Sequence, residues 1–267
     1  MSTSYILNTN EKARQRLSLQ HQLYVDSSLE LLHKAGIEKG MTGLEIGCGA
    51  GDMTKELSRL VGNNGNILTI DFSPEQIAYV KKLTHDLTNI RYKVWDVNQI
   101  SQLDETFDFI YCRMVLHHLS NASHAIGEMK KCLNPGGVVI CEEPSIFESA
   151  VCYPESKDQQ QFVNYVQSCF SQNNKDYKIA FRMEQEFRNV GMQITAHGLY
   201  EPLLTTRDEK MIYPMALDDI TSQLLDSKLT TKKDVDNLLS NLIELAKSET
   251  TLSWIRMHQV VAKVEPL

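Results

Sequence analysis

The chain has 267 residues, of which 42% are hydrophobic and 23% charged, a composition typical of a globular protein with a packed core. Its formal net charge of −7 argues against nonspecific binding to nucleic acid or anionic membranes, because both need basic surfaces. No apolar run approaches the roughly 20 residues that span a bilayer, and the first 15 residues lack the apolar core of a secretory signal. We therefore expect a cytoplasmic protein that binds neither nucleic acid nor a membrane.

The cysteines predict neither disulfides nor a metal centre. They contain no Cys-x-x-Cys pair and have no histidine at metal-ligand spacing. Several fall within apolar segments, where a free thiol packs as a small hydrophobe. We expect reduced cysteines and no metal site. The six are Cys48, Cys112, Cys132, Cys141, Cys152 and Cys169.

The pattern of apolar residues predicts a leading amphipathic helix over residues 11–35, followed by strands and helices in alternation. Predicted strands lie at 43–47, 66–71, 90–95, 107–111 and 137–142, with helices at 52–61, 74–86 and 122–133 between them. Short apolar strands separated by helices indicate an α/β fold with a parallel sheet and helices on both faces. Past Pro144 we expect helical cap segments, a helix at 181–190, a sixth strand at 192–199, two helices within 208–248 and a last strand at 251–264.

A glycine-rich turn follows the first predicted strand and leads into a helix that begins near Asp52. Its glycines are Gly47, Gly49 and Gly51, with Glu45 two residues before the first of them. This strand–turn–helix context is typical of a ligand site in which the ligand contacts backbone. A dinucleotide fingerprint needs glycine where Asp52 stands, and Glu45 would repel phosphates. A ligand with an ammonium or sulfonium group fits this turn better.

Acids end the next two strands. Asp71 lies about twenty residues after the turn, where an acid commonly binds ribose hydroxyls, and Phe72 could cover a purine. Asp71 could instead cap the helix that begins after Ser73. Asp96 could accept a hydrogen bond from an exocyclic amine while the backbone of Val97 contacts the ring edge, or it could be an ordinary loop aspartate.

The segment after the fourth strand should face the ligand held by the turn. It begins with Cys112 and Arg113, and the Arg113 guanidinium could pair with a carboxylate. His117 and His118 follow, and a neutral imidazole is a usable base near pH 7. A histidine at the start of a helix is more often structural, so both interpretations stay open here.

Taken together, these residues resemble the class I S-adenosylmethionine-dependent methyltransferases. Residues 40–145 carry the resemblance: the turn with Glu45, the acids Asp71 and Asp96, the fourth strand at 107–110, and the segments 115–119 and 133–137. The resemblance implies a Rossmann-like sheet of seven mostly parallel strands whose last strand is antiparallel. It also implies S-adenosyl-L-methionine as cofactor, with Cys48, Val97, Cys112 and Arg113 among the residues that contact it.

Within this family the chain looks closest to small-molecule methyltransferases. That resemblance implies a single domain over 1–267, with an N-terminal lid (1–40), a cofactor-binding core (41–144), a substrate-side cap (145–180 and 200–248) and a last strand (251–264). The expected reaction is in-line displacement of the methyl group by a small-molecule acceptor. The alternatives are a catalytically silent cofactor-binding protein and a nicotinamide dehydrogenase, which Asp52 and Glu45 disfavour. The residues indicate neither an oligomeric state nor which atom is methylated.

Overall fold

The computed structural model describes residues 11–146, 148–171 and 176–265 of the chain. These residues fall into two compact units. The larger unit contains residues 24–145, 176–200 and 257–265, and the smaller unit contains the remainder. Helix α1 (Glu11–Lys34) begins in the smaller unit and ends in the larger one.

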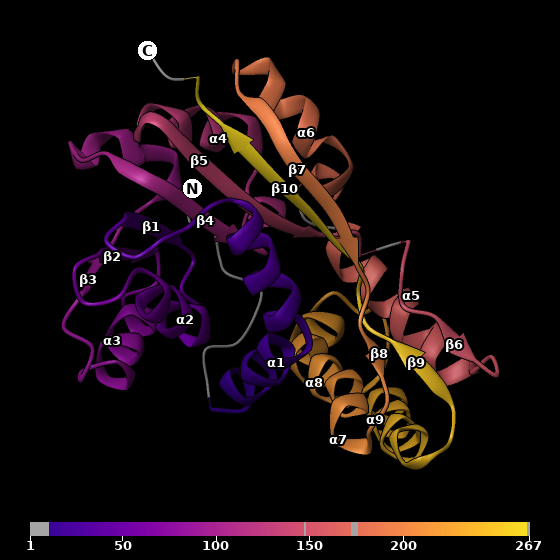
Figure 1. The fold of residues 1–267 in the computed structure, drawn as a ribbon. Helices are drawn as coiled ribbons and strands as arrows, with labels where there is room; N and C mark the ends of the chain where they lie inside the picture. Colours follow the sequence, from indigo (N-terminus) through magenta and orange to yellow (C-terminus); the bar gives the residue numbers. More distant parts are fainter. Residues whose placement is uncertain (1–10, 147, 172–175, 266–267) are drawn as a thin grey trace. The chain divides into compact units, whose positions relative to one another are not determined.

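The larger unit is built on a seven-stranded sheet with the strand order β3-β2-β1-β4-β5-β10-β7 (Figure 1). Six strands run in one direction, and β10 is antiparallel to both of its neighbours. The predicted α/β, Rossmann-like sheet with a reversed last strand is therefore confirmed. The strands are β1 (Thr42–Ile46), β2 (Asn66–Asp71), β3 (Ile90–Val94), β4 (Phe107–Arg113), β5 (Leu133–Pro144), β7 (Gln193–Tyr200) and β10 (Met257–Lys263).

Helices cover both faces of this sheet because the strands are apolar on both sides. On one face, α4, α6 and η1 pack against side chains such as Leu44, Ile110 and Val139. On the other face, α2 and the end of α1 pack against side chains such as Phe109 and Ile140. The helical elements of this unit, besides the end of α1, are α2 (Asp52–Val61), α3 (Pro74–Leu83), η1 (Val97–Leu103), η2 (Leu116–His118), α4 (Ala122–Lys131) and α6 (Ile179–Asn189).

The smaller unit combines helices with a three-stranded antiparallel sheet of order β6-β9-β8. Its core contains edge-to-face aromatic contacts, with ring centroids of Tyr213 and Trp254 5.0 Å apart and those of Phe162 and Tyr213 5.1 Å apart. A buried ion pair joins Arg16 of α1 to Asp219 of α8. Apart from α1, the elements are β6 (Cys152–Tyr153), α5 (Lys157–Ser171), β8 (Leu203–Leu204), α7 (Arg207–Lys210), α8 (Ile212–Asp226), α9 (Lys232–Lys247) and β9 (Thr251–Ser253).

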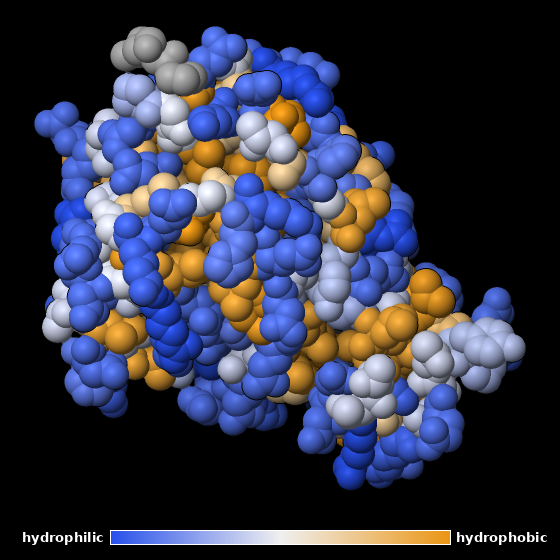
Figure 2. Space-filling model, viewed as in Figure 1, coloured by the Kyte–Doolittle hydropathy of each residue, from blue (hydrophilic) through white to orange (hydrophobic). Residues whose placement is uncertain are grey.

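The small sheet carries apolar side chains on both faces. Leu204 and Leu252 are buried, whereas Tyr153 is 75% exposed and Leu203 62% exposed. Figure 2 shows an apolar patch on the surface where Figure 1 places α5 and β6. Among the described residues, no helix has both the length and the apolar character needed to cross a membrane.

The prediction of one continuous last strand at 251–264 is wrong. The segment forms β9, which pairs with β6 and β8, and β10, which pairs with β5 and β7. The chain leaves β9 at Trp254, whose side chain packs against Tyr213, and Arg256 then forms an ion pair with Glu201 at 2.8 Å. The contacts of these two side chains interrupt the strand. The segment predicted as two helices within 208–248 contains three, since a four-residue helix with a capping box at Thr206 precedes α8.

Candidate cofactor and active site

The glycine turn lies at the carboxyl end of β1, between β1 and α2. Its first N–H, that of Gly47, donates to the carbonyl of Ile70 at 2.8 Å, which holds the turn against β2. Gly47 has φ = 78°, and a Cβ built on it would lie 2.4 Å from Cγ2 of Val115. Glycine is therefore required here both by backbone conformation and by the close approach of the loop that follows β4.

Glu45 lies inside the protein beneath this turn. It is 1% exposed, and its Oε2 accepts hydrogen bonds from Thr54 of α2 at 2.6 Å and Thr69 of β2 at 2.8 Å. Burial raises the pKa of Glu45 to about 7, although the two threonine hydroxyls and the positive charge of Arg113 favour the carboxylate. Glu45 thus joins β1, α2 and β2 and also fixes the first turn of α2.

Asp71 lies against the glycine turn at the end of β2. Its carboxylate accepts the backbone N–H of Ser73 at 2.9 Å and the Cys48 thiol at 3.7 Å, and hydrogen bonds from the Gly49 and Cys48 backbone favour its charged form. Burial nevertheless raises the pKa of Asp71. Ser73 caps α3, and the adjacent Asp71 supports that helix start. Asp71 and the turn therefore form one contiguous polar surface at the carboxyl ends of β1 and β2, which is where ligands of open α/β sheets bind.

The remaining predicted adenine contacts differ in exposure. Phe72 is 47% exposed. Asp96 is exposed and caps η1, accepting the N–H of Asn98 at 2.9 Å through Oδ1. The Val97 side chain is buried in the core, so only its backbone could contact a ligand.

The end of β4 places two predicted residues in different environments. The Cys112 side chain is fully buried beside Cys141, so any ligand contact would come from its backbone. Arg113 donates to the Ser28 hydroxyl of α1 at 3.1 Å, and its charge acts on both Glu45 and Tyr111. The Arg113 charge therefore acts on Glu45, which lies beneath the glycine turn, and its role toward a cofactor stays a prediction.

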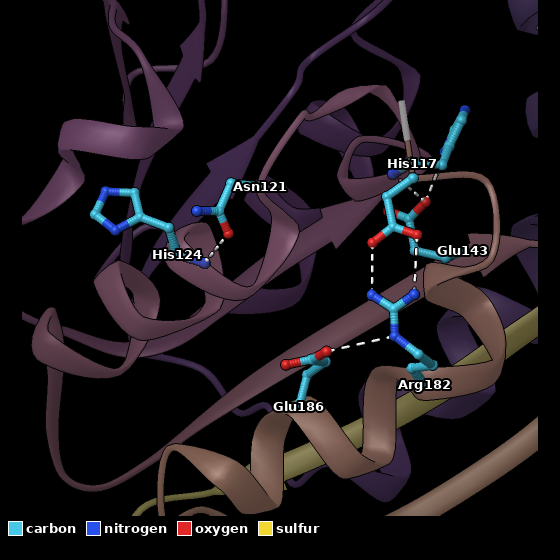
Figure 3. Close-up of polar contacts among 7 residues, drawn as sticks. His117, Asn121, His124, Glu143, Arg182 and Glu186 are labelled. Carbon is cyan, nitrogen blue, oxygen red and sulfur yellow. Dashed lines mark hydrogen bonds and ion pairs between the residues drawn. The ribbon is translucent and has the colours of Figure 1, made fainter. Parts of the chain in front are cut away.

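His117 and His118 form the end of η2, directly after β4. Nδ1 of His117 lies 2.6 Å from Oε2 of Glu143, which ends β5 (Figure 3). The two imidazole rings contact each other, with centroids 3.9 Å apart and planes tilted by 42°. His117 is buried, and its ring also lies 6.1 Å from that of Tyr177.

Two residues that the sequence pattern did not single out belong to this region. Glu143 is fully buried and contacts the whole 115–117 segment. Gln76 of α3 is 2% exposed, and neither its amide oxygen nor its amide nitrogen has a partner among the described residues. For Glu143 the available signal was a pair of acids directly after the apolar run at 138–141, whereas no local signal marks Gln76. Among the described residues, no cluster of three His, Cys, Asp or Glu side chains could hold a metal ion.

A seven-stranded sheet with a reversed last strand and a glycine turn after β1 defines a Rossmann-like fold of the methyltransferase class. A family described as a methyltransferase domain matches residues 37–210. A demethylmenaquinone methyltransferase from Staphylococcus aureus (strain MRSA252) is 34% identical over 110 residues, which are 41% of this chain and 46% of that protein. The chain thus spans less than half the length of this relative.

Solved structures share the fold at low sequence identity. A SAM-dependent methyltransferase from Aquifex aeolicus superposes with a TM-score of 0.52 at 18% identity, covering 71% of this chain and 92% of that one. The [4+2]-cyclase SpnF gives 0.56 at 15% identity, covering 91% and 81%. At such identities the likeness shows the fold alone. The family match over residues 37–210 shows more: this chain belongs to the class I S-adenosylmethionine-dependent methyltransferases.

Proposed function

We propose that the protein transfers a methyl group from S-adenosyl-L-methionine to a small-molecule acceptor. The observation that carries this proposal is the polar surface formed by the glycine turn and Asp71 at the carboxyl ends of β1 and β2. The family match favours an enzyme over a silent cofactor-binding protein. It also disfavours the nicotinamide dehydrogenase alternative.

In the proposed complex the glycine turn, Asp71 and Asp96 each bind a different part of the cofactor. Gly47, Gly49 and Gly51, with the intervening Cys48, would let the ligand approach the backbone closely. Asp71 would bind the ribose hydroxyls with Phe72 nearby, and Asp96 with the Val97 backbone would read the adenine edge. The charge of Arg113 would pair with the methionine carboxylate, and the Cys112 backbone would line the same strand end. Glu45 would act indirectly, by supporting the turn from below.

Bound S-adenosyl-L-methionine supplies an electrophilic methyl carbon on a sulfonium. The protein's task is to align the acceptor for in-line attack, and good alignment alone can lower the barrier by roughly 7–11 kcal/mol. Where the acceptor must lose a proton, His117 or His118 would take it, which would contribute a factor of about 10²–10⁴. No metal ion is required for this chemistry.

The smaller unit is proposed to select the acceptor, and residues 1–40 are proposed to form the N-terminal lid, of which residues 1–10 lie outside the described part of the chain. Exposed apolar side chains of the smaller unit, such as Tyr153 and Leu203, would favour a partly apolar acceptor. The name of the Staphylococcus relative, a demethylmenaquinone methyltransferase, agrees with this class. A cytoplasmic location is proposed because all six cysteines are free thiols.

Calorimetric titration with S-adenosylmethionine and S-adenosylhomocysteine tests the cofactor assignment. A micromolar dissociation constant is expected for each ligand, which corresponds to a binding free energy of about −8 kcal/mol. A panel of quinols, phenols and amines with methyl-labelled cofactor then tests transfer. Absence of binding by both ligands would refute the cofactor assignment, whereas binding without transfer to any panel member would favour the silent alternative.

A further inference from the structure

Glu143, at the carboxyl end of β5, accepts hydrogen bonds from three backbone N–H groups of the loop that follows β4 and contacts a ring nitrogen of His117 in the same loop. Its Oε1 accepts the backbone N–H of Val115 at 2.9 Å and that of Leu116 at 2.7 Å. Its Oε2 accepts the backbone N–H of His117 at 3.2 Å and lies 2.6 Å from Nδ1 of the same residue (Figure 3). A fully buried carboxylate with this many donors holds the loop in one conformation.

These contacts determine which ring nitrogen of His117 carries hydrogen. Backbone N–H groups can only donate, so the three backbone contacts require both oxygens of Glu143 to accept. In the carboxylate form of Glu143, which the three backbone N–H groups favour, Oε2 can only accept, so its contact of 2.6 Å places the hydrogen of the imidazole on Nδ1. In the neutral ring Nε2 therefore has no hydrogen, and Nε2 is the nitrogen that can act as a base.

The same carboxylate fixes the loop relative to the cofactor turn. Met114, directly before the contacted segment, has φ = 56°, an uncommon conformation for a side-chain-bearing residue. Val115 then lies so close to Gly47 that a Cβ there would be 2.4 Å from Cγ2 of Val115. Glu143 thus sets both the contact between loop and turn and the orientation of the His117 ring, against which His118 packs at 3.9 Å.

Other charged groups surround this pair. Burial raises the pKa of Glu143 to about 7, the three backbone N–H groups oppose that shift, and the negative charge of Asp176 adds to it. Asp176 is itself held by Arg182 of α6 in two contacts of 3.1 and 2.6 Å, and Glu186 lies 3.4 Å from the same guanidinium. Among the described residues, the titratable or charged groups that contact the pair or act on it are His118, Tyr177, Asp176 and Cys112. Arg182 and Glu186 lie one contact further away, through Asp176.

We propose that Glu143 is a positioning residue that holds His117 with hydrogen on Nδ1 and so presents Nε2 as the base for methyl transfer. The proposal rests on the proposed function. As an acceptor oxygen or nitrogen attacks the methyl carbon, the carbon–sulfur bond breaks and its electron pair stays on sulfur, giving S-adenosylhomocysteine. The acceptor's proton moves to Nε2, and the resulting imidazolium is stabilised by the Glu143 carboxylate until the proton passes to water.

The first test reads the tautomer directly and needs no activity. Nitrogen-15 NMR of the full chain with S-adenosylhomocysteine present, with His117→Gln used to assign the signals, is expected to show hydrogen on Nδ1 of His117. In Glu143→Gln the amide NH₂ cannot accept, so the ring should change to the Nε2-protonated tautomer. The matched control is Glu142→Gln, which neutralises the neighbouring fully buried carboxylate bonded to Tyr111 and Gln259 and should leave the His117 signals unchanged. Hydrogen on Nε2 of wild-type His117 overturns the proposal, and that outcome does not require Glu143→Gln to fold.

The second test separates positioning from folding in the methyl-transfer assay. Glu143→Gln is expected to lower kcat by about 10²–10⁴ with the KM for S-adenosylmethionine little changed, and to shift the acidic limb of the pH profile. In His117→Asn the side-chain amide can still donate to Glu143 but offers no base, so adding Glu143→Gln to it should cause little further loss of kcat. Equal, additive losses would overturn the proposal. Wild-type protein that binds cofactor but never transfers methyl, while His117 keeps hydrogen on Nδ1, would instead refute the proposed function.

Discussion

Replacing Gly47 by alanine should destabilise the protein for two separable reasons. The residue has φ = 78°, and holding a side-chain-bearing residue in the left-handed region costs roughly 1–2 kcal/mol. Its Cβ would also lie 2.4 Å from Cγ2 of Val115, and overpacking of this kind costs about 1–3 kcal/mol. The free energy of unfolding, measured by urea denaturation, should therefore fall by about 2–5 kcal/mol.

The chain provides a matched control for each contribution. Gly136 has the same φ of 78° but no atom within 4 Å of a Cβ built on it, so Gly136→Ala should show the backbone cost alone, about 1–2 kcal/mol. In a Gly47→Ala, Val115→Ala double variant, loss of Cγ2 should recover most of the overpacking cost. The reasoning is refuted if Gly47→Ala costs no more than Gly136→Ala, or if the Val115 truncation recovers nothing. Calorimetry of the same variants should show weaker binding of S-adenosylhomocysteine only where the turn is altered.

Three further outcomes are expected. Asp71→Ala should weaken binding of S-adenosylmethionine by about 1.5–3 kcal/mol, the scale of a charge-assisted hydrogen bond, and unchanged affinity in calorimetry would remove its ribose role. Glu45 has a folded-state pKa of about 7, above its unfolded value near 4.5, so its stabilising contribution is complete below pH 4.5 and is lost as pH rises through about 7. Between these two limits the free energy of unfolding should fall by on the order of 3 kcal/mol. Urea denaturation of Glu45→Gln should show a smaller decline over the same pH range. Asp219→Ala leaves the Arg16 guanidinium buried and unpaired and should cost about 3–5 kcal/mol in thermal or urea unfolding, whereas Arg16→Met with Asp219→Leu should recover much of it.

Local patterns in the sequence predicted helices and strands well where a clear apolar period ended at turn residues. The strand 66–71 and the helix 52–61 have the predicted bounds, because an apolar run and an amphipathic period ended at clear turn residues. The segment 251–264 is predicted as one strand, but the structure divides it into β9 and β10. The interruption at Trp254–Arg256 depends on Tyr213 and Glu201, which lie far away in the chain.

In the candidate site, too, local sequence signals predicted some features, whereas others depend on contacts between residues far apart in the chain. The positions of Asp71 and Arg113 at strand ends followed from topology alone. The contact of Glu143 with residues 115–117 did not, because 26 to 28 positions separate the partners and nothing local marks them. The exposed or buried state of Cys112 and Val97 likewise depends on which side of the sheet each residue faces once the core has formed.

The two consecutive glutamates that end β5 have a consequence for the order in which this part of the protein becomes rigid. Glu142 bonds Tyr111 and Gln259, whereas Glu143 bonds the loop at 115–117, and both carboxylates are fully buried. Burying either carboxylate before its hydrogen-bond donors are in place would cost free energy. The end of β5 can therefore become buried only after β10, which carries Gln259, and η2, which contains His117, have both packed against it. This edge of the sheet is therefore expected to form as one cooperative unit late in folding, and its amide hydrogens to exchange together rather than strand by strand.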